Sequence, residues 1–96
     1  MSSEVLELLA RNRDRIRSFG VRSLALFGSA VRNEATPGSD LDFLVEFDRK
    51  TFDNYMDLKF FLEGLLGRPV DLVPRDAVKP RLREPILAEA VHAPGL

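Results

Sequence analysis

The sequence predicts an α+β fold, in which a small mixed β-sheet has helices packed on one face. The chain has 96 residues, which is the size of one domain, so we expect a single domain over 1–96. Hydrophobic residues make up 45% and charged residues 30%, a composition typical of a soluble globular protein. Two strand patterns joined by a turn, then a helix and another strand, indicate a mixed sheet.

The first predicted elements are a helix and a buried strand. The helix begins at Ser2 or Ser3 and ends at Gly20, because apolar residues recur between them at helical spacing. These residues are Val5, Leu8, Leu9, Ile16 and Phe19. The short apolar run 21–27 (VRSLALF) then predicts a buried strand, and 30–33 can open a short helix.

A loop, a strand and a second helix follow. Residues 34–39 (EATPGS) contain proline and glycine and predict a loop. Apolar and polar residues alternate in much of 41–47, which indicates a strand. Helical spacing then returns, with Asp53 or Asn54 as the N-cap and Gly64 or Gly67 at the end. Its apolar positions are Tyr55, Leu58, Leu62 and Leu65.

The last third of the chain predicts one strand and one short helix. Residues 69–73 (PVDLV) form the strand. Pro80 and Pro85 argue against a long helix, so we expect a short helix over 86–91 that starts on Pro85.

Charge and cysteine content exclude several classes of protein. The 14 basic and 15 acidic residues leave a net charge of -1, so we expect no direct nucleic-acid binding and no membrane binding. There is no cysteine, which excludes disulfides, thiolate metal sites and a cysteine nucleophile. The N-terminal segment is charged and amphipathic, unlike a signal peptide, so we expect a cytoplasmic protein.

Asp40 and Asp42 lie two residues apart at the head of a predicted strand. A period of two sends both carboxylates to the same face, where they repel unless a cation lies between them. Carboxylate oxygens suit a hard divalent cation. The plainer interpretation, which stays open, is a capping residue at the end of the loop and one solvent-facing aspartate.

Asp71 adds a third acid, in the strand 69–73. Its apolar neighbours Val70 and Leu72 point the opposite way, so Asp71 faces away from the core. If this strand lies beside 41–47, three carboxylates converge on one face and suit a two-metal site. The alternative is an exposed residue on an edge strand.

Gly28 and Ser29 follow a buried strand and precede a predicted helix start. Backbone N–H groups and the helix dipole there can hold an anion such as a phosphate. A plain turn is the other interpretation. The pair is neither a Walker loop nor a G-x-S-x-G nucleophile elbow.

The stretch 26–47 (LFGSAVRNEATPGSDLDFLVEF), together with Asp71, resembles the nucleotidyltransferase superfamily that includes polymerase beta. Within it, the chain is similar over nearly its whole length to the minimal nucleotidyltransferase (MNT) proteins paired with HEPN partners in prokaryotic toxin–antitoxin systems. The resemblance implies metal ligation by three catalytic carboxylates and triphosphate binding by three further residues. The carboxylates are Asp40, Asp42 and Asp71, and the nucleotide-binding residues are Gly28, Ser29 and Arg32.

The resemblance also implies an activity. Two Mg²⁺ ions and ATP would be needed, AMP would move to a hydroxyl, and the acceptor would be a tyrosine of a HEPN toxin that is thereby neutralised. Ala30 and Asn33 depart from the family pattern, which commonly has a basic residue and a glycine there. Two alternatives stay open: a non-catalytic binding antitoxin, and the catalytic subunit of a small-molecule nucleotidyltransferase.

The remaining notable residues have plainer interpretations. His92 is expected to be exposed in the tail, and Tyr55 to belong to the core. The aromatic residues Phe52, Phe60 and Phe61 lie in the core or cover a partner-facing patch. A solvated face is expected for the basic residues near the C-terminus, although they could dock an acidic partner. These are Arg75, Lys79, Arg81 and Arg83.

Overall fold

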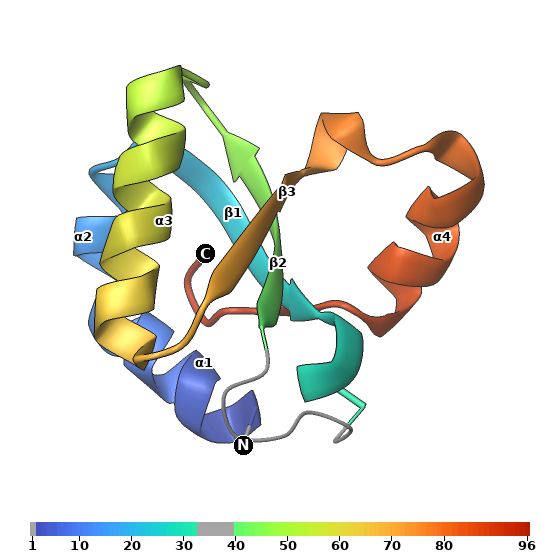
Figure 1. Cartoon of the computed structure of the whole chain (residues 1–96), viewed down its shortest axis with the longest axis horizontal. Coiled ribbons are helices and arrows are strands. Elements are labelled where there is room, and N and C mark those ends of the chain that lie inside the picture. Colours follow the sequence, from blue (N-terminus) through green and yellow to red (C-terminus); the bar gives the residue numbers. More distant parts are fainter. Residues whose placement is uncertain (1, 33–39) are drawn as a thin grey trace.

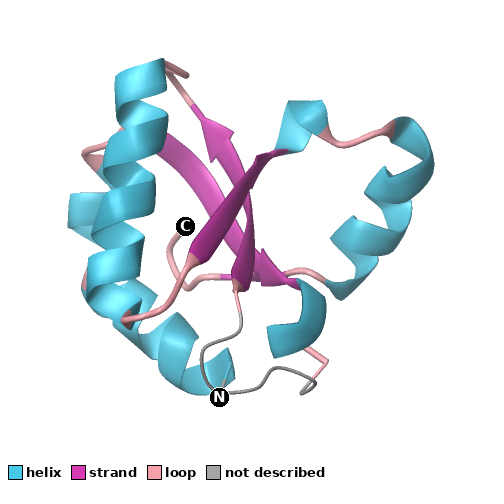
Figure 2. Ribbon diagram, viewed as in Figure 1, coloured by secondary structure: helices cyan, strands magenta, loops and turns pink. Residues whose placement is uncertain are grey.

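A computed structural model describes residues 2–32 and 40–96 (Figures 1 and 2). The first half contains α1 (Ser2–Arg11), α2 (Arg13–Arg17), β1 (Val21–Phe27), the 3₁₀ turn η1 (Gly28–Ala30) and β2 (Leu41–Phe47). The second half contains α3 (Phe52–Leu66), β3 (Val70–Pro74), the 3₁₀ turn η2 (Arg75–Ala77), α4 (Pro80–Glu89) and β4 (Val91–His92). Among the described residues, no helix has the length and apolar character that a membrane span requires.

The four strands form one mixed sheet in the order β3-β2-β1-β4. β1 pairs antiparallel with both β2 and β4, whereas β2 and β3 are parallel. Parallel neighbours need a crossover connection, and α3 provides it. The α+β class and the mixed sheet predicted from the sequence are confirmed.

The larger core lies between the sheet and the first three helices, α1, α2 and α3, which share one side of the sheet in Figure 1. Leu9, Ile16 and Leu62 come from these helices and are fully buried. Phe43 is the largest fully buried side chain, and it projects from β2 into this layer. Most of the periodic apolar positions of the sequence are therefore core positions, although Leu6 packs against this core and the predicted Leu8 does not belong to it.

The second face of the sheet is covered by α4, which the sequence did not place (Figure 1). Ile86 and Leu87 of α4 pack against Ala25 of β1 and Leu44 of β2. No residue of α4 is fully buried. The helices thus lie mainly on one face, as predicted, with a smaller apolar contact on the other.

The start of α4 corrects the prediction for the C-terminal region. The helix begins at Pro80, not Pro85, and ends at Glu89. Proline is well suited to the first position of a helix, where no intrahelical N–H bond is made. Pro85 lies inside the helix, where its ring cannot donate to the carbonyl of Arg81. Ten residues therefore form the helix at the cost of one backbone hydrogen bond.

Smaller corrections concern helix ends. The N-terminal helix is two helices, because the chain leaves the α-conformation at Asn12. α3 is capped by Thr51, whose hydroxyl accepts the N–H of Asn54 at 3.0 Å, in place of the predicted Asp53 or Asn54. Gly67 ends α3 with a φ of 65°.

Three further differences lie in the loops and at the end of the chain. β4 was not predicted, since two residues are too few to show a strand period. The strand predicted over 69–73 is shifted by one residue. The short helix predicted over 30–33 is replaced by η1, and both Asn33 and the predicted loop 34–39 lie outside the described residues.

Candidate active site

Asp42 and Asp71 lie side by side on two parallel strands. They are register partners in β2 and β3, whose backbones run about 4.8 Å apart. The next pair along, Phe43 and Leu72, is buried in the larger core. Because side chains alternate, both aspartates face the second side of the sheet. The adjacency assumed in the sequence analysis is therefore present, although β3 is also an edge strand and Asp71 is exposed.

Asp40 precedes β2 and is exposed. It is close enough to raise the pKa of Asp42, so all three carboxylates act on one region of the surface. Within 2–32 and 40–96, however, no three acidic or histidine side chains are gathered closely enough to hold a metal ion. Register brings Asp42 and Asp71 together, while Asp40 stands beside them without completing a ligand set.

Asp42 carries the clearest electrostatic signature of the site. Partial burial raises its pKa, and the charges of Asp71 and Asp40 raise it further. Arg32 acts in the opposite direction. A carboxylate in this setting gains from a nearby positive charge, and oxygen donors are what Mg²⁺ prefers. Asp42 and Asp71 therefore supply oxygen donors of the kind that a divalent cation prefers, while a third carboxylate ligand is not in place among the described residues.

Gly28 follows β1 directly beside Asp42. Its φ is 81°, a conformation that side-chain-bearing residues rarely adopt. A Cβ atom there would lie 3.2 Å from Cγ and 3.3 Å from Cβ of Asp42, and would overlap the carboxylate oxygen. The backbone can approach Asp42 this closely only because residue 28 has no side chain.

The turn after Gly28 differs from the helix start that was predicted. η1 has three residues, too few for a helix dipole of any size. Any anion binding here depends on individual N–H groups and on nearby cations. Ser29 is the middle residue of this turn, and its side chain lies outside the described part.

Glu89, at the end of α4, is the site residue that the sequence analysis missed. Its Oε1 accepts the Gly28 N–H at 2.8 Å. Nη1 of Arg32 donates to Oε1 at 2.9 Å and to Oε2 at 3.0 Å. The Gly28 N–H, and after it Arg32, holds the pKa of Glu89 below its usual range although desolvation opposes this. An ionised carboxylate is thus held by two of the residues predicted to bind phosphate.

One sequence signal could have revealed Glu89. Ile86, Leu87 and Ala90 are the apolar residues of α4 that pack on the sheet. Glu89 lies three residues after Ile86 and directly before Ala90, so helical spacing places it on the same face. An acid among inward-facing apolar positions needs a partner, and here the partner is the Gly28–Arg32 pair.

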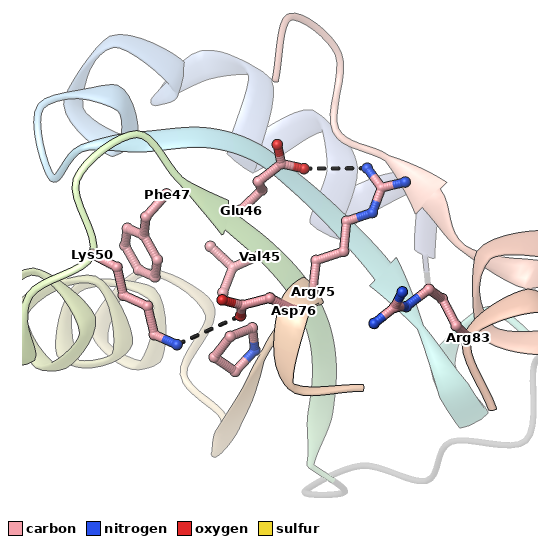
Figure 3. Close-up of a pocket in the computed structure, with 8 residues that line it drawn as sticks. Val45, Glu46, Phe47, Lys50, Arg75, Asp76 and Arg83 are labelled. Atoms are coloured by element: carbon pink, nitrogen blue, oxygen red, sulfur yellow. Dashed lines mark hydrogen bonds and ion pairs between the residues drawn. The ribbon is translucent and has the colours of Figure 1, made fainter. Parts of the chain in front are cut away.

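A separate cavity of about 410 Å³ lies at the opposite ends of β2 and β3 (Figure 3). Two ion pairs line it: Arg75 with Glu46 at 3.1 Å, and Lys50 with Asp76 at 3.5 Å. Glu46 lies four residues beyond Asp42, which is about 13 Å along a strand. The cavity contains none of the residues predicted to bind metal or nucleotide.

The structure also gives the positions of the other residues noted in the sequence. Tyr55 is half-buried, and its hydroxyl donates to the carbonyl of Leu72 at 2.9 Å. Phe52 and Phe60 are 78% and 61% exposed on α3. His92 is exposed in β4.

Two register-paired aspartates with a third acid beside them, next to a glycine N–H and an arginine, can hold a metal-bound phosphate group. On this mixed sheet, that set of residues defines the class of nucleotidyltransferases. The profile of the nucleotidyltransferase domain family matches residues 6–92, and the chain belongs to this family.

Relatives agree with this assignment. The protein adenylyltransferase MntA of Thermococcus cleftensis is 37% identical over 91 residues, which are 93% of this chain and 92% of that protein. A solved minimal nucleotidyltransferase is 43% identical, with a TM-score of 0.73, over 90% of this chain and 93% of that one.

A more distant structure shares the fold. It is the MNT antitoxin in complex with a tri-AMPylated HEPN toxin from Shewanella oneidensis, with a TM-score of 0.64 and 18% identity. The match covers 92% of this chain and 71% of that one. At this identity the comparison concerns the fold alone.

Proposed function

We propose that this nucleotidyltransferase transfers AMP from ATP to a hydroxyl group of a partner protein, a tyrosine of a HEPN toxin, and thereby acts as an antitoxin in the cytoplasm. The observation that carries the proposal is the register pairing of Asp42 with Asp71 beside the Gly28 N–H. Similarity to a named protein adenylyltransferase over more than nine-tenths of both chains supports the protein acceptor. The proposal treats 1–96 as one minimal nucleotidyltransferase domain.

Each site residue has a role in this proposal. Asp40, Asp42 and Asp71 would hold two Mg²⁺ ions, which would screen the triphosphate from the carboxylates and acidify the acceptor hydroxyl. The N–H of Gly28, with Ser29, would donate to the triphosphate, and Arg32 would pair with a phosphate oxygen. Asp71 is exposed and can accept the proton of the incoming hydroxyl.

The exposure of Asp71 supports an acceptor on another molecule. Asp71 is exposed on an edge strand, so a hydroxyl can approach it from solvent. The nearest residues that line the cavity in Figure 3, Val45 and Pro74, lie three residues beyond Asp42 and Asp71, about 10 Å along the strands, and neither aspartate lines the cavity. A partner protein can present a tyrosine directly to the exposed edge.

Label transfer tests the proposal. The protein, Mg²⁺ and α-labelled ATP are mixed with the product of the neighbouring gene, with an Asp40→Asn, Asp42→Asn double variant as control. We expect label on a tyrosine of the partner with the wild-type protein and none with the double variant. Equal labelling by both proteins would refute the roles of the aspartates.

A binding antitoxin is the second candidate, and one observation favours it. Glu89 already occupies the donors that a phosphate would need. If the partner is neutralised at stoichiometric amounts without label transfer, and the Asp40→Asn, Asp42→Asn variant neutralises it equally, binding without catalysis is the function.

A further inference from the structure

Gly28 and Arg32 offer their donors to a carboxylate of the same chain. The Gly28 N–H is a single donor, and at 2.8 Å its hydrogen bond to Glu89 is fully formed. Arg32 meets both oxygens of the same carboxylate, at 2.9 and 3.0 Å. A carboxylate and a phosphate group are both anions with oxygen acceptors, and both suit such a pair of donors.

We propose that Glu89 is an internal competitor of the nucleotide, whose carboxylate occupies the place of a phosphate group and must leave before ATP binds. The inference rests on the proposed function, since it takes Gly28 and Arg32 as phosphate-binding residues. The Gly28 N–H serves one acceptor at a time at full strength, so the closed contact and the nucleotide complex exclude each other.

Like charges add to this exclusion. Glu89 stands close enough to Asp42 to raise the pKa of Asp42, so its carboxylate adds negative charge to a site that must accept a triphosphate. A nucleotide that arrives while Glu89 is in place meets four carboxylates instead of three. Removal of Glu89 from the site therefore both frees donors and lowers the repulsion.

α4 has the features of an element that can move away. None of its residues is fully buried, and its contact with the sheet is the smaller of the two apolar clusters. Pro85 removes one backbone hydrogen bond from its interior. Few buried contacts and a missing hydrogen bond mean a low free energy of local opening. Release of Glu89 can thus accompany a shift of α4 on the second face of the sheet, with β1, β2 and β3 in place.

Nucleotide binding tests this inference without any transfer step. Calorimetry measures the Kd of Mg-ATP for the wild-type protein and for Glu89→Gln, and Glu84→Gln on the same helix is the matched control. We expect Glu89→Gln to bind about tenfold more tightly, because a neutral amide competes weakly for the two donors. Glu84 is exposed and should leave the Kd unchanged.

A second variant separates two effects of Glu89: its hydrogen bond to the Gly28 N–H and its negative charge. Glu89→Asp keeps the negative charge but shortens the side chain by one methylene, so it no longer reaches the Gly28 N–H. We expect its Kd to lie between those of the wild-type protein and Glu89→Gln. A Kd for Glu89→Asp equal to the wild-type value would overturn the claim that the hydrogen bond to Gly28 is what the nucleotide displaces.

Hydrogen exchange gives an independent readout of the same contact. Saturating Mg-ATP should increase amide exchange in the C-terminal half of α4 in the wild-type protein, and Glu89→Gln should show the increase without nucleotide. If Glu89→Gln binds more weakly than wild type, Glu89 supports the nucleotide and the inference is wrong. Absence of Mg-ATP binding by all variants would overturn it as well. A missing label transfer with these Kd shifts present would refute only the proposed acceptor.

Discussion

Asp42 shows how a single side chain can serve the site at the expense of the fold. Its pKa is raised, first by burial and then by Asp71 and Asp40, so the folded protein holds a proton on Asp42 more tightly than the unfolded chain does. In the absence of metal, stability therefore falls as pH rises from the ordinary value of 3.8 through the raised value. At neutral pH the ionised Asp42 carboxylate therefore lowers the free energy of unfolding.

The first prediction concerns Asp42→Asn. Measured in EDTA at pH 7, its free energy of unfolding should exceed that of the wild-type protein by less than about 1 kcal/mol, because solvent screens a half-buried group. Urea denaturation followed by circular dichroism measures the gain, which should vanish below pH 3. Asp57→Asn, exposed on α3, is the control and should change little. A destabilised Asp42→Asn at pH 7 would contradict this account.

Gly28 carries the second prediction. Gly28→Ala places a methyl group against the Asp42 carboxylate in a backbone conformation that alanine avoids, so we expect a loss of about 1–3 kcal/mol of stability and of nearly all label transfer. Gly64→Ala is the matched control. Gly64 lies inside α3 with open space around it, and its replacement should stabilise the protein by about 0.5–1 kcal/mol. Equal thermal shifts for the two variants would disprove the conformational argument.

The residue scale also shows what a sequence can predict. A period of two in β2 predicts that Asp42 faces away from the core, and the apolar neighbours of Asp71 predict the same for β3. The pairing of these strands could be assumed only conditionally, because register depends on contacts between distant segments. Glu89 escaped the prediction for a similar reason: its partners, Gly28 and Arg32, lie 61 and 57 residues away.

At the scale of elements, α3 fixes the position of β3. It connects the two parallel strands, and Tyr55 donates a hydrogen bond to the carbonyl of Leu72, next to Asp71. β3 is an edge strand, so one side of its backbone has no neighbouring strand. The tyrosine hydroxyl satisfies one of those carbonyls.

Tyr55→Phe is the third prediction. Loss of this hydrogen bond should cost about 1 kcal/mol of stability, and the amide of Asp71 should exchange faster with solvent. Amide exchange by NMR measures both effects in one experiment. Thr51→Ala should cost a similar amount through loss of the α3 cap, without a specific effect at Asp71. The same exchange profile in both variants would show that Tyr55 does not hold β3 in particular.

The ends of helices and strands were predicted correctly where the apolar periodicity is strong. They were missed where the backbone hydrogen bonds of a few residues determine the end. The bounds of β1 and β2 follow their apolar runs closely. The break at Asn12 and the start of α4 at Pro80 do not follow from any period. They depend on backbone hydrogen bonds of single residues, which a pattern of apolar positions does not record.

At the scale of the whole molecule, the larger core joins α1, α2 and α3 to β1, β2 and β3, so these elements should unfold as a unit. The fourth prediction is that Leu62→Ala, which empties a fully buried position of α3, costs about 2–5 kcal/mol. Circular dichroism of the helices and an NMR signal from Asp42 should report the same midpoint in urea. Separate midpoints would show that the β2–β3 pair, with its aspartates, opens apart from the core.

The pairing of β2 with β3 has a consequence for how this protein can fail. Asp42 with Asp71 and Phe43 with Leu72 are adjacent pairs of the same ladder. A slip of β3 by one residue would turn Asp71 toward the helices and Leu72 toward water, while Asp42 and Phe43 of β2 would keep their sides. A misaligned chain therefore loses stability twice, because a charge is buried and an apolar side chain is exposed. The alignment that completes the stable core therefore also places the two acids side by side.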